Sequence, residues 1–128
     1  MRSGLLFILA LSLFCCGDDH VATQTSLNGK WVEINTRTDT LTFLVMDENP
    51  YVTLDRGREI RNGHLLPKIG SGIYRYRLFH DSISLYWTLS SNSDYNHYYF
   101  NQTGDALIVG NFYDPDLKGA RDTFKKLN

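Results

Sequence analysis

Short alternations of apolar and polar residues run through most of the chain, and clusters of turn-forming residues separate them. Leu41, Phe43 and Val45, for example, occupy every second position, whereas Thr40 and Thr42 fall on the opposite face. Because successive side chains of a strand point to opposite faces, this period of two predicts strands that bury one face. No window of adequate length has the period of a helix.

The clearest predicted hairpin joins the segments 72–80 and 83–89 through the turn Asp81-Ser82. We expect the tyrosine face of the first segment to point inward and its arginine face outward, because an arginine without a partner is costly in an apolar interior. The inward side chains are then Tyr74, Tyr76 and Leu78, facing Ile83, Leu85, Trp87 and Leu89.

The predicted strands follow one another at spacings of roughly 10 residues, with short turns between them. Their ranges are 29–35, 39–46, 51–55, 72–80, 83–89, 95–102, 106–113 and 122–127, and the segment 56–60 either extends the third or begins another. Short turns favour an antiparallel meander, and a closed barrel leaves no exposed edge. The sequence therefore predicts an all-β fold, an antiparallel up-and-down barrel of about eight strands.

A different pattern precedes these strands. Arg2 is followed by an apolar run from Leu5 to Phe14, and the acidic pair Asp18-Asp19 comes soon after the run. One positive charge before a short apolar run is the layout of a secretory signal, and the run is shorter than the about 20 apolar residues of a membrane-spanning helix. We interpret residues 1–15 as a cleaved signal peptide.

The segment Leu13-Phe14-Cys15-Cys16 resembles the lipobox, the cleavage motif of bacterial lipoproteins. The resemblance implies that Cys16 receives diacylglycerol before cleavage and an N-acyl chain such as palmitate after it. One acyl chain holds a protein only marginally, since each buried CH₂ contributes about 0.8 kcal/mol, so the several chains on one cysteine make a firm anchor. The membrane is then a partner of the protein through lipidated Cys16.

This resemblance predicts a lipid-anchored protein of the cell envelope, at the outer membrane of a Gram-negative bacterium. We expect residues 16–27 to form the lipidated cysteine and a flexible tether, and residues 28–128 to form the barrel domain. Asp18-Asp19 either resembles the surface-export signal of Bacteroidetes-type lipoproteins or is a solvated spacer.

Charge and cysteine content exclude two other classes. Both cysteines lie at the end of the leader, so the barrel domain forms no internal disulfide. Removal of residues 1–15 changes the formal net charge from −1 to −2, because Arg2 is the only charged residue removed. This balance, without basic clusters, argues against a nucleic-acid partner.

Gly29-Lys30-Trp31, at the start of the first strand, resembles the Gly-x-Trp opening of lipocalins and of the lipocalin-like domains of small bacterial lipoproteins. The basic segment 122–126 is similar to the closing strand of such domains. The resemblance implies that Gly29 permits a tight entry and that Trp31 plugs the closed end of the barrel. It also implies that Arg121 or Lys125 lies over the indole as a cation–π partner.

An eight-stranded barrel is just wide enough to be filled by side chains or to hold one small ligand. The inward aromatic residues make a candidate pocket whose hydroxyl groups are available to a ligand. Its residues are Trp87, Tyr74, Tyr76, Leu85, Tyr98 and Phe100. The alternative is a filled core in which those hydroxyl groups pair internally.

Catalytic chemistry is not indicated by any motif. The four histidines are scattered without metal-ligand spacing, and no serine or cysteine sits in a nucleophile motif such as Gly-x-Ser-x-Gly. We therefore expect a protein that is not an enzyme, with no cofactor and no metal site. The sequence favours an envelope lipoprotein that binds an apolar or amphipathic small molecule. The alternative is a filled barrel that acts as a protein-interaction module, such as an envelope accessory subunit or a protease-inhibitor-type barrel, through rim loops such as 56–72.

Overall fold

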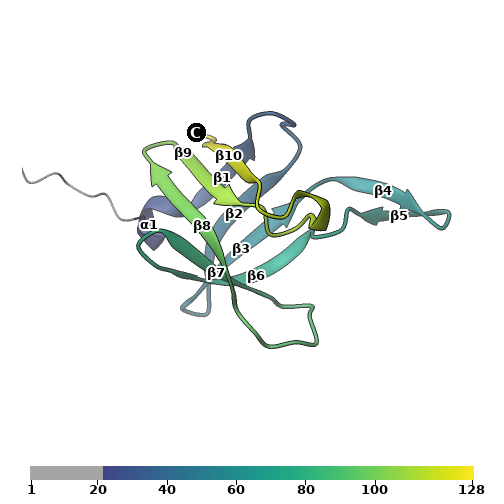
Figure 1. Ribbon diagram of the computed structural model, residues 1–128, viewed down its shortest axis with the longest axis horizontal. Helices are drawn as coiled ribbons and strands as arrows, with labels where there is room; N and C mark the ends of the chain where they lie inside the picture. Colours follow the sequence, from purple (N-terminus) through teal and green to yellow (C-terminus); the bar gives the residue numbers. More distant parts are fainter. Residues whose placement is uncertain (1–21) are drawn as a thin grey trace, which may run out of the picture.

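The computed structural model describes residues 22–128, so the predicted signal peptide and Cys16 lie outside the described residues. Eight strands form a closed antiparallel barrel in which each strand pairs with the next barrel strand along the chain and the last pairs with the first (Figure 1). The strands are β1 (Gly29–Glu33), β2 (Thr40–Met46), β3 (Asn49–Asp55), β6 (Gly72–Leu78), β7 (Ser82–Trp87), β8 (Asn96–Thr103), β9 (Ala106–Gly110) and β10 (Arg121–Lys126). The predicted all-β up-and-down barrel is confirmed.

Two further strands form a separate hairpin between β3 and β6. The strands β4 (Arg58–Arg61) and β5 (His64–Pro67) pair only with each other among the described residues, and they extend away from the barrel at the right of Figure 1. The turn Asn62-Gly63 joins them, as its sequence indicates. Pro67 lies in an edge strand, where its missing N–H is tolerated.

Alternate side chains of the barrel strands fill its interior. Tyr74 and Tyr76 are buried and Arg75 and Arg77 are exposed, as the alternation predicts. The Tyr76 ring meets the Phe43 ring edge-on, with the two ring centres 5.4 Å apart. The buried apolar residues are Leu27, Trp31, Leu41, Phe43, Val52, Leu54, Tyr74, Tyr76, Ile83, Leu85, Phe100, Leu107, Val109, Tyr113 and Phe124.

The inward row expected along β7 ends earlier than the alternation suggests. Ile83 and Leu85 are buried, but 38% of Trp87 and 74% of Leu89 are exposed. The strand ends at Trp87, at one end of the barrel, so Trp87 lies at the rim and Leu89 lies in the following loop. The alternation shows which face of the sheet a side chain occupies, but not how far along the barrel axis that side chain lies.

A short helix, α1 (Gln24–Leu27), lies at the opposite end, at the left of Figure 1. The side chains of Thr23 and Ser26 cap it reciprocally, and Leu27 is fully buried. The indole Nε1 of Trp31 donates a hydrogen bond of 2.8 Å to the main-chain oxygen of Leu27. Residues 24–27 therefore belong to the folded unit, and the expectation of a flexible tether over 16–27 is wrong for these four residues.

The cation above the indole is Lys126, and the expectation of Arg121 or Lys125 is wrong. The Lys126 Nζ lies 5.4 Å from the centre of the Trp31 ring. Lys126 pairs directly with Trp31 across β1 and β10, so both side chains share the inward face, whereas Lys125 pairs with outward Val32. The Arg121 guanidinium instead lies 3.6 Å from the centre of the Tyr99 ring.

Within residues 22–128, no helix has the length and apolar character needed to cross a membrane.

Candidate functional site

Two adjoining recesses open at the end of the barrel opposite α1. The first has a volume of about 320 Å³ and the second about 200 Å³. Four aromatic residues line both of them: Tyr74, Trp87, Tyr98 and Phe112. These residues come from β6, β7, β8 and the loop 111–120 between β9 and β10. The site therefore exists only once the barrel has brought distant parts of the chain together.

The four rings are in contact with one another around the recess. Tyr74 stacks on Trp87 with ring centres 6.3 Å apart and planes inclined by 19°. Phe112 meets Tyr74 edge-on at 5.1 Å and Tyr98 at 5.8 Å. Since Trp87 is 38% exposed, part of this aromatic surface faces solvent. Such a surface offers dispersion contacts and ring faces to an apolar or flat group.

Hydrogen bonding fixes the hydroxyl group of Tyr74. It donates to the main-chain oxygen of Gly70 over 2.6 Å. Burial raises the pKa of Tyr74 to about 12, so the phenol stays protonated at neutral pH. Gly70 has a positive φ of 91°, and a Cβ there would lie 2.6 Å from the Cβ of Tyr113. Glycine at this position therefore lets the chain approach the loop that borders the recess.

The second recess has a polar wall formed by the β7–β8 connection and the first residue of β8. Its polar lining residues are Ser90, Asn92, Asp94 and Asn96. Together they offer hydroxyl, amide and carboxylate oxygens, but no basic side chain. The first recess is bordered instead by Asn111, Asp114 and Lys118, beside apolar Ile69 and Pro115. The combined site is thus apolar at its centre and polar at its edges.

A polar network holds the loop 111–120 against the barrel. The hydroxyl of Tyr113 donates to a carboxylate oxygen of Asp39 at 3.1 Å and of Asp122 at 3.2 Å. The Asn111 side chain donates to Asp122 at 2.8 Å, and the Arg56 guanidinium lies 4.7 Å from the centre of the Tyr113 ring. Burial, and to a smaller extent the nearby carboxylates, raises the pKa of Tyr113 far above its ordinary value. Its hydroxyl therefore stays protonated and can donate these hydrogen bonds. The loop that carries Phe112 is therefore firmly positioned.

The six residues of the predicted pocket divide into two groups. Tyr74, Trp87 and Tyr98 line both recesses, and Leu85 lines the second. Tyr76 and Phe100 are each only 2% exposed and belong to the filled interior. Sequence reasoning missed Phe112, because 106–113 was expected to be one continuous strand, whereas β9 ends at Gly110.

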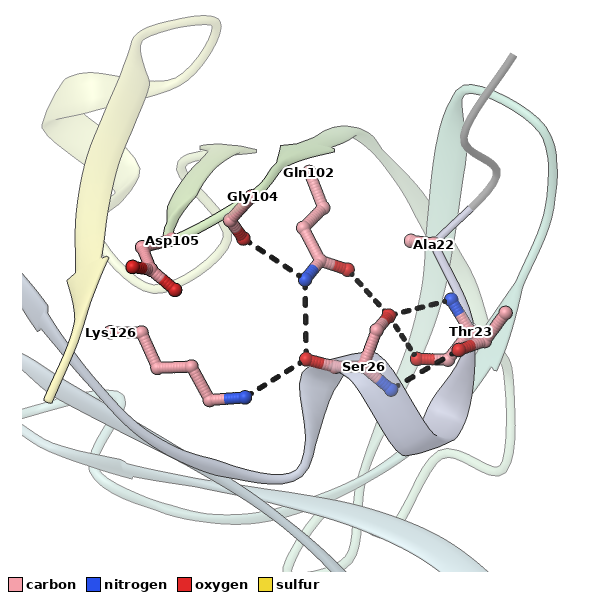
Figure 2. A pocket seen from close by; sticks show the side chains of 7 residues that line it. All are labelled: Ala22, Thr23, Ser26, Gln102, Gly104, Asp105 and Lys126. Atoms are coloured by element: carbon pink, nitrogen blue, oxygen red, sulfur yellow. Dashed lines mark hydrogen bonds between the residues drawn. The ribbon is translucent and has the colours of Figure 1, made fainter. Parts of the chain in front are cut away.

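Another hollow, of about 420 Å³, lies at the α1 end and is shown in Figure 2. Its polar groups bind one another. Gln102 accepts from the hydroxyl of Ser26 at 2.8 Å and donates to the main-chain oxygens of Ser26 and Gly104, and Lys126 Nζ donates to the same Ser26 oxygen at 3.1 Å. This network attaches α1 to the barrel. Although the hollow is larger, it has no aromatic lining, so we assign the candidate site to the open end.

In the described part of the chain, no three histidine, cysteine or acidic side chains are close enough to hold a metal ion. Comparison with known proteins found no matching family model, no matching curated protein and no matching solved structure.

Proposed function

We propose that this protein is a lipid-anchored envelope protein whose lipocalin-like barrel binds a small apolar or amphipathic molecule at its open end. The observation that carries the proposal is the aromatic recess of Tyr74, Trp87, Tyr98 and Phe112, with Trp87 partly exposed. Ligand sites are typically concave, mostly apolar, and provided with a few polar groups at defined positions. The apolar centre and polar edges of this site have that character.

The dimensions of the site limit the ligand. Its larger recess, about 320 Å³, is near the lower end of the range of roughly 300–1,000 Å³ typical of ligand pockets. The interior below it is filled by residues such as Tyr76, Phe100 and Phe43. A long acyl chain has no room to enter the barrel axis. We therefore propose a ligand of one or two rings, or of similar size, that lies across the mouth.

A dye-binding experiment tests this proposal. The probe is N-phenyl-1-naphthylamine, a small apolar aromatic amine, and its fluorescence should rise when it binds the protein. Trp87→Ala and Phe112→Ala should each weaken dye binding at least tenfold. Leu89→Ala is the matched control, because Leu89 is 74% exposed and lines neither recess. Dye binding that survives both recess substitutions would contradict the proposed site.

The anchor is proposed from the lipobox resemblance at Cys16. Native mass spectrometry of the detergent-extracted protein from its own host should give a mass that begins at Cys16 and includes acyl chains. Cys16→Ser should abolish cleavage and lipidation. Cys15→Ala is the matched control and should be processed normally. An unprocessed wild-type chain that begins at Met1 would overturn the anchor and leave the ligand proposal unaffected.

One observation favours a second candidate, a protein-interaction module with a filled core. The barrel interior is packed with buried side chains from β2, β6, β7 and β8. The same native spectrum distinguishes the two functions. A non-covalent small-molecule adduct supports the binding function, whereas a lipidated protein without an adduct, together with no dye binding, favours the interaction module.

A further inference from the structure

The β4–β5 hairpin is well defined, but no layer of the described structure covers it. Asn62 and Gly63 both have positive φ, 51° and 78°, as a tight two-residue hairpin turn requires. Ile60 and Leu65 pair directly across the two strands and share one face, yet 75% and 60% of their surfaces are exposed. An isolated two-stranded hairpin is marginally stable in water, so a third strand would stabilise it.

The hydrogen-bond pattern shows which edge of the hairpin can accept another strand. The main-chain N–H of Lys68 donates to the oxygen of Gly57 at 3.0 Å, which makes these two residues a hydrogen-bonded pair. Bonded and non-bonded pairs alternate along an antiparallel ladder. In the observed register, the main-chain groups of Arg58 and Ile60 therefore point away from β5, toward the outer edge of β4.

The outer edge of β5 is less suitable for pairing. Its outward-pointing residues are Leu65 and Pro67, and Pro67 has no N–H to donate. A proline on an edge strand is a common protection against pairing. The open edge of the hairpin is therefore the β4 edge.

We propose that the β4 edge pairs antiparallel with the β4 edge of a second copy of this chain, about a twofold axis at Ile60. The sequence of β4 is self-complementary in this register. Ile60 lies opposite Ile60 of the second copy, and Glu59 lies opposite Arg61 of the second copy in both directions. Opposite charges directly across a sheet are favourable, whereas like charges are unfavourable.

The neighbouring twofold registers fail for identifiable reasons. A shift by one residue places Ile60 opposite Glu59 or Arg61 of the second copy. The main-chain groups of Ile60 point outward, whereas those of Glu59 and Arg61 already bond to β5. A shift of two residues in one direction places Glu59 against Glu59, and in the other direction places Arg61 against Arg61. The register centred on Ile60 therefore satisfies both the hydrogen-bond alternation and the charges.

Pairing in this register produces a four-stranded sheet with one apolar row. Because directly paired residues share a face, the row contains Leu65 and Ile60 of one copy followed by Ile60 and Leu65 of the other. The most exposed apolar side chains of the hairpin thus become neighbours. The hairpin extends away from the barrel on the side opposite α1 (Figure 1), and no described strand other than β5 pairs with β4.

Sedimentation velocity of the detergent-solubilised full chain, over a series of protein concentrations, tests the pairing. We expect a monomer–dimer equilibrium for the wild type. Glu59→Arg and Arg61→Glu alone should each weaken association at least tenfold, because each places like charges opposite one another and also removes the 3.2 Å ion pair between Glu59 and Arg61 of the same chain. Ile60→Pro should have the same effect, because it removes an outward N–H that the hairpin itself does not use.

A mixture of the two charge variants provides the decisive control. In a one-to-one mixture, the arginines of the Glu59→Arg chain face the glutamates of the Arg61→Glu chain, so the mixture should regain wild-type association. This recovery would also show that both variants are folded. A wild type that stays monomeric at every concentration, single variants that associate like the wild type, or a mixture that stays monomeric would each overturn the proposal.

Discussion

Lys126 and Trp31 are direct partners across β1 and β10, and the Lys126 ammonium lies 5.4 Å from the centre of the fully buried indole ring. The same ammonium donates a hydrogen bond to Ser26, while the indole N–H donates to Leu27. Side chains from the first and the last barrel strand therefore hold α1 in place. This end of the barrel should depend on Trp31 more than on Lys126, because burial of a large ring contributes more than a partly exposed charge.

Trp31→Ala should lower the free energy of unfolding by about 3–5 kcal/mol, because it leaves a large cavity and removes the hydrogen bond to Leu27. Chemical denaturation monitored by circular dichroism measures this loss. Trp87→Ala is the matched control and should cost less, since Trp87 is 38% exposed. A free energy of unfolding that is nearly unchanged in Trp31→Ala would contradict the role of Trp31 as the barrel plug.

Tyr76→Phe should be neutral or raise the free energy of unfolding by up to about 1 kcal/mol. Among the described residues, the buried hydroxyl of Tyr76 has no hydrogen-bond partner, so its removal relieves a desolvation cost. Tyr74→Phe is the matched comparison and should lower the free energy of unfolding by about 1 kcal/mol, because it removes the bond to Gly70. Equal effects of the two substitutions would show that the Tyr76 hydroxyl is satisfied in solution.

Glu33 should contribute stability at neutral pH that disappears in acid. Burial acts to raise the pKa of Glu33, but hydrogen bonds from Thr36 and Asn35 outweigh it and lower that pKa below its ordinary value. Its contribution is therefore fully present above the unfolded-state pKa of about 4.3 and is lost as the pH falls through the lower folded-state pKa. The stability difference between wild type and Glu33→Gln should shrink over this range; a difference independent of pH would contradict this role.

The contribution of Asp39 to stability should change with pH in the opposite direction to that of Glu33. Burial raises the pKa of Asp39, although the hydrogen bond from Tyr113 and the charge of Arg56 act to lower it. A carboxyl with a raised folded-state pKa favours the folded state most below the unfolded-state pKa of about 3.9, and this advantage falls as the pH rises through the raised value. The wild type should therefore lose stability relative to Asp39→Asn as the pH rises through that window, and denaturation curves at several pH values measure the trend. A gain would show that the interactions with Tyr113 and Arg56 outweigh burial.

The barrel could be predicted because each of its strands carries its own alternation. The inward position of Tyr74 and Tyr76 followed from the cost of burying the arginines between them. Helix α1 could not be predicted, because four residues are too few to show a helical period and its stability comes from the caps and the burial of Leu27. Likewise, the choice between Lys125 and Lys126 depends on a register that differs by one residue.

The candidate site was harder to predict than the fold. Tyr74, Trp87, Tyr98 and Leu85 were identified from alternation, but their depth along the barrel depends on where each strand ends. Phe112 joins them only because the chain leaves the sheet after Gly110 and turns across the opening. The bonds that hold this loop connect Tyr113 to Asp39 and Asp122, and no local pattern links these three residues.

The pairing of β1 with β10 also determines when the molecule can fold. This ladder joins the first barrel strand to the last. Every other ladder of the barrel joins successive barrel strands, although the β4–β5 hairpin is inserted between β3 and β6. Contacts between residues so far apart in the sequence form slowly. The barrel also cannot close before β10 is available to pair with β1. A chain emerging during synthesis should therefore be unable to close its barrel until β10 is complete and free to pair with β1. An export system that requires an unfolded substrate would find it in that state.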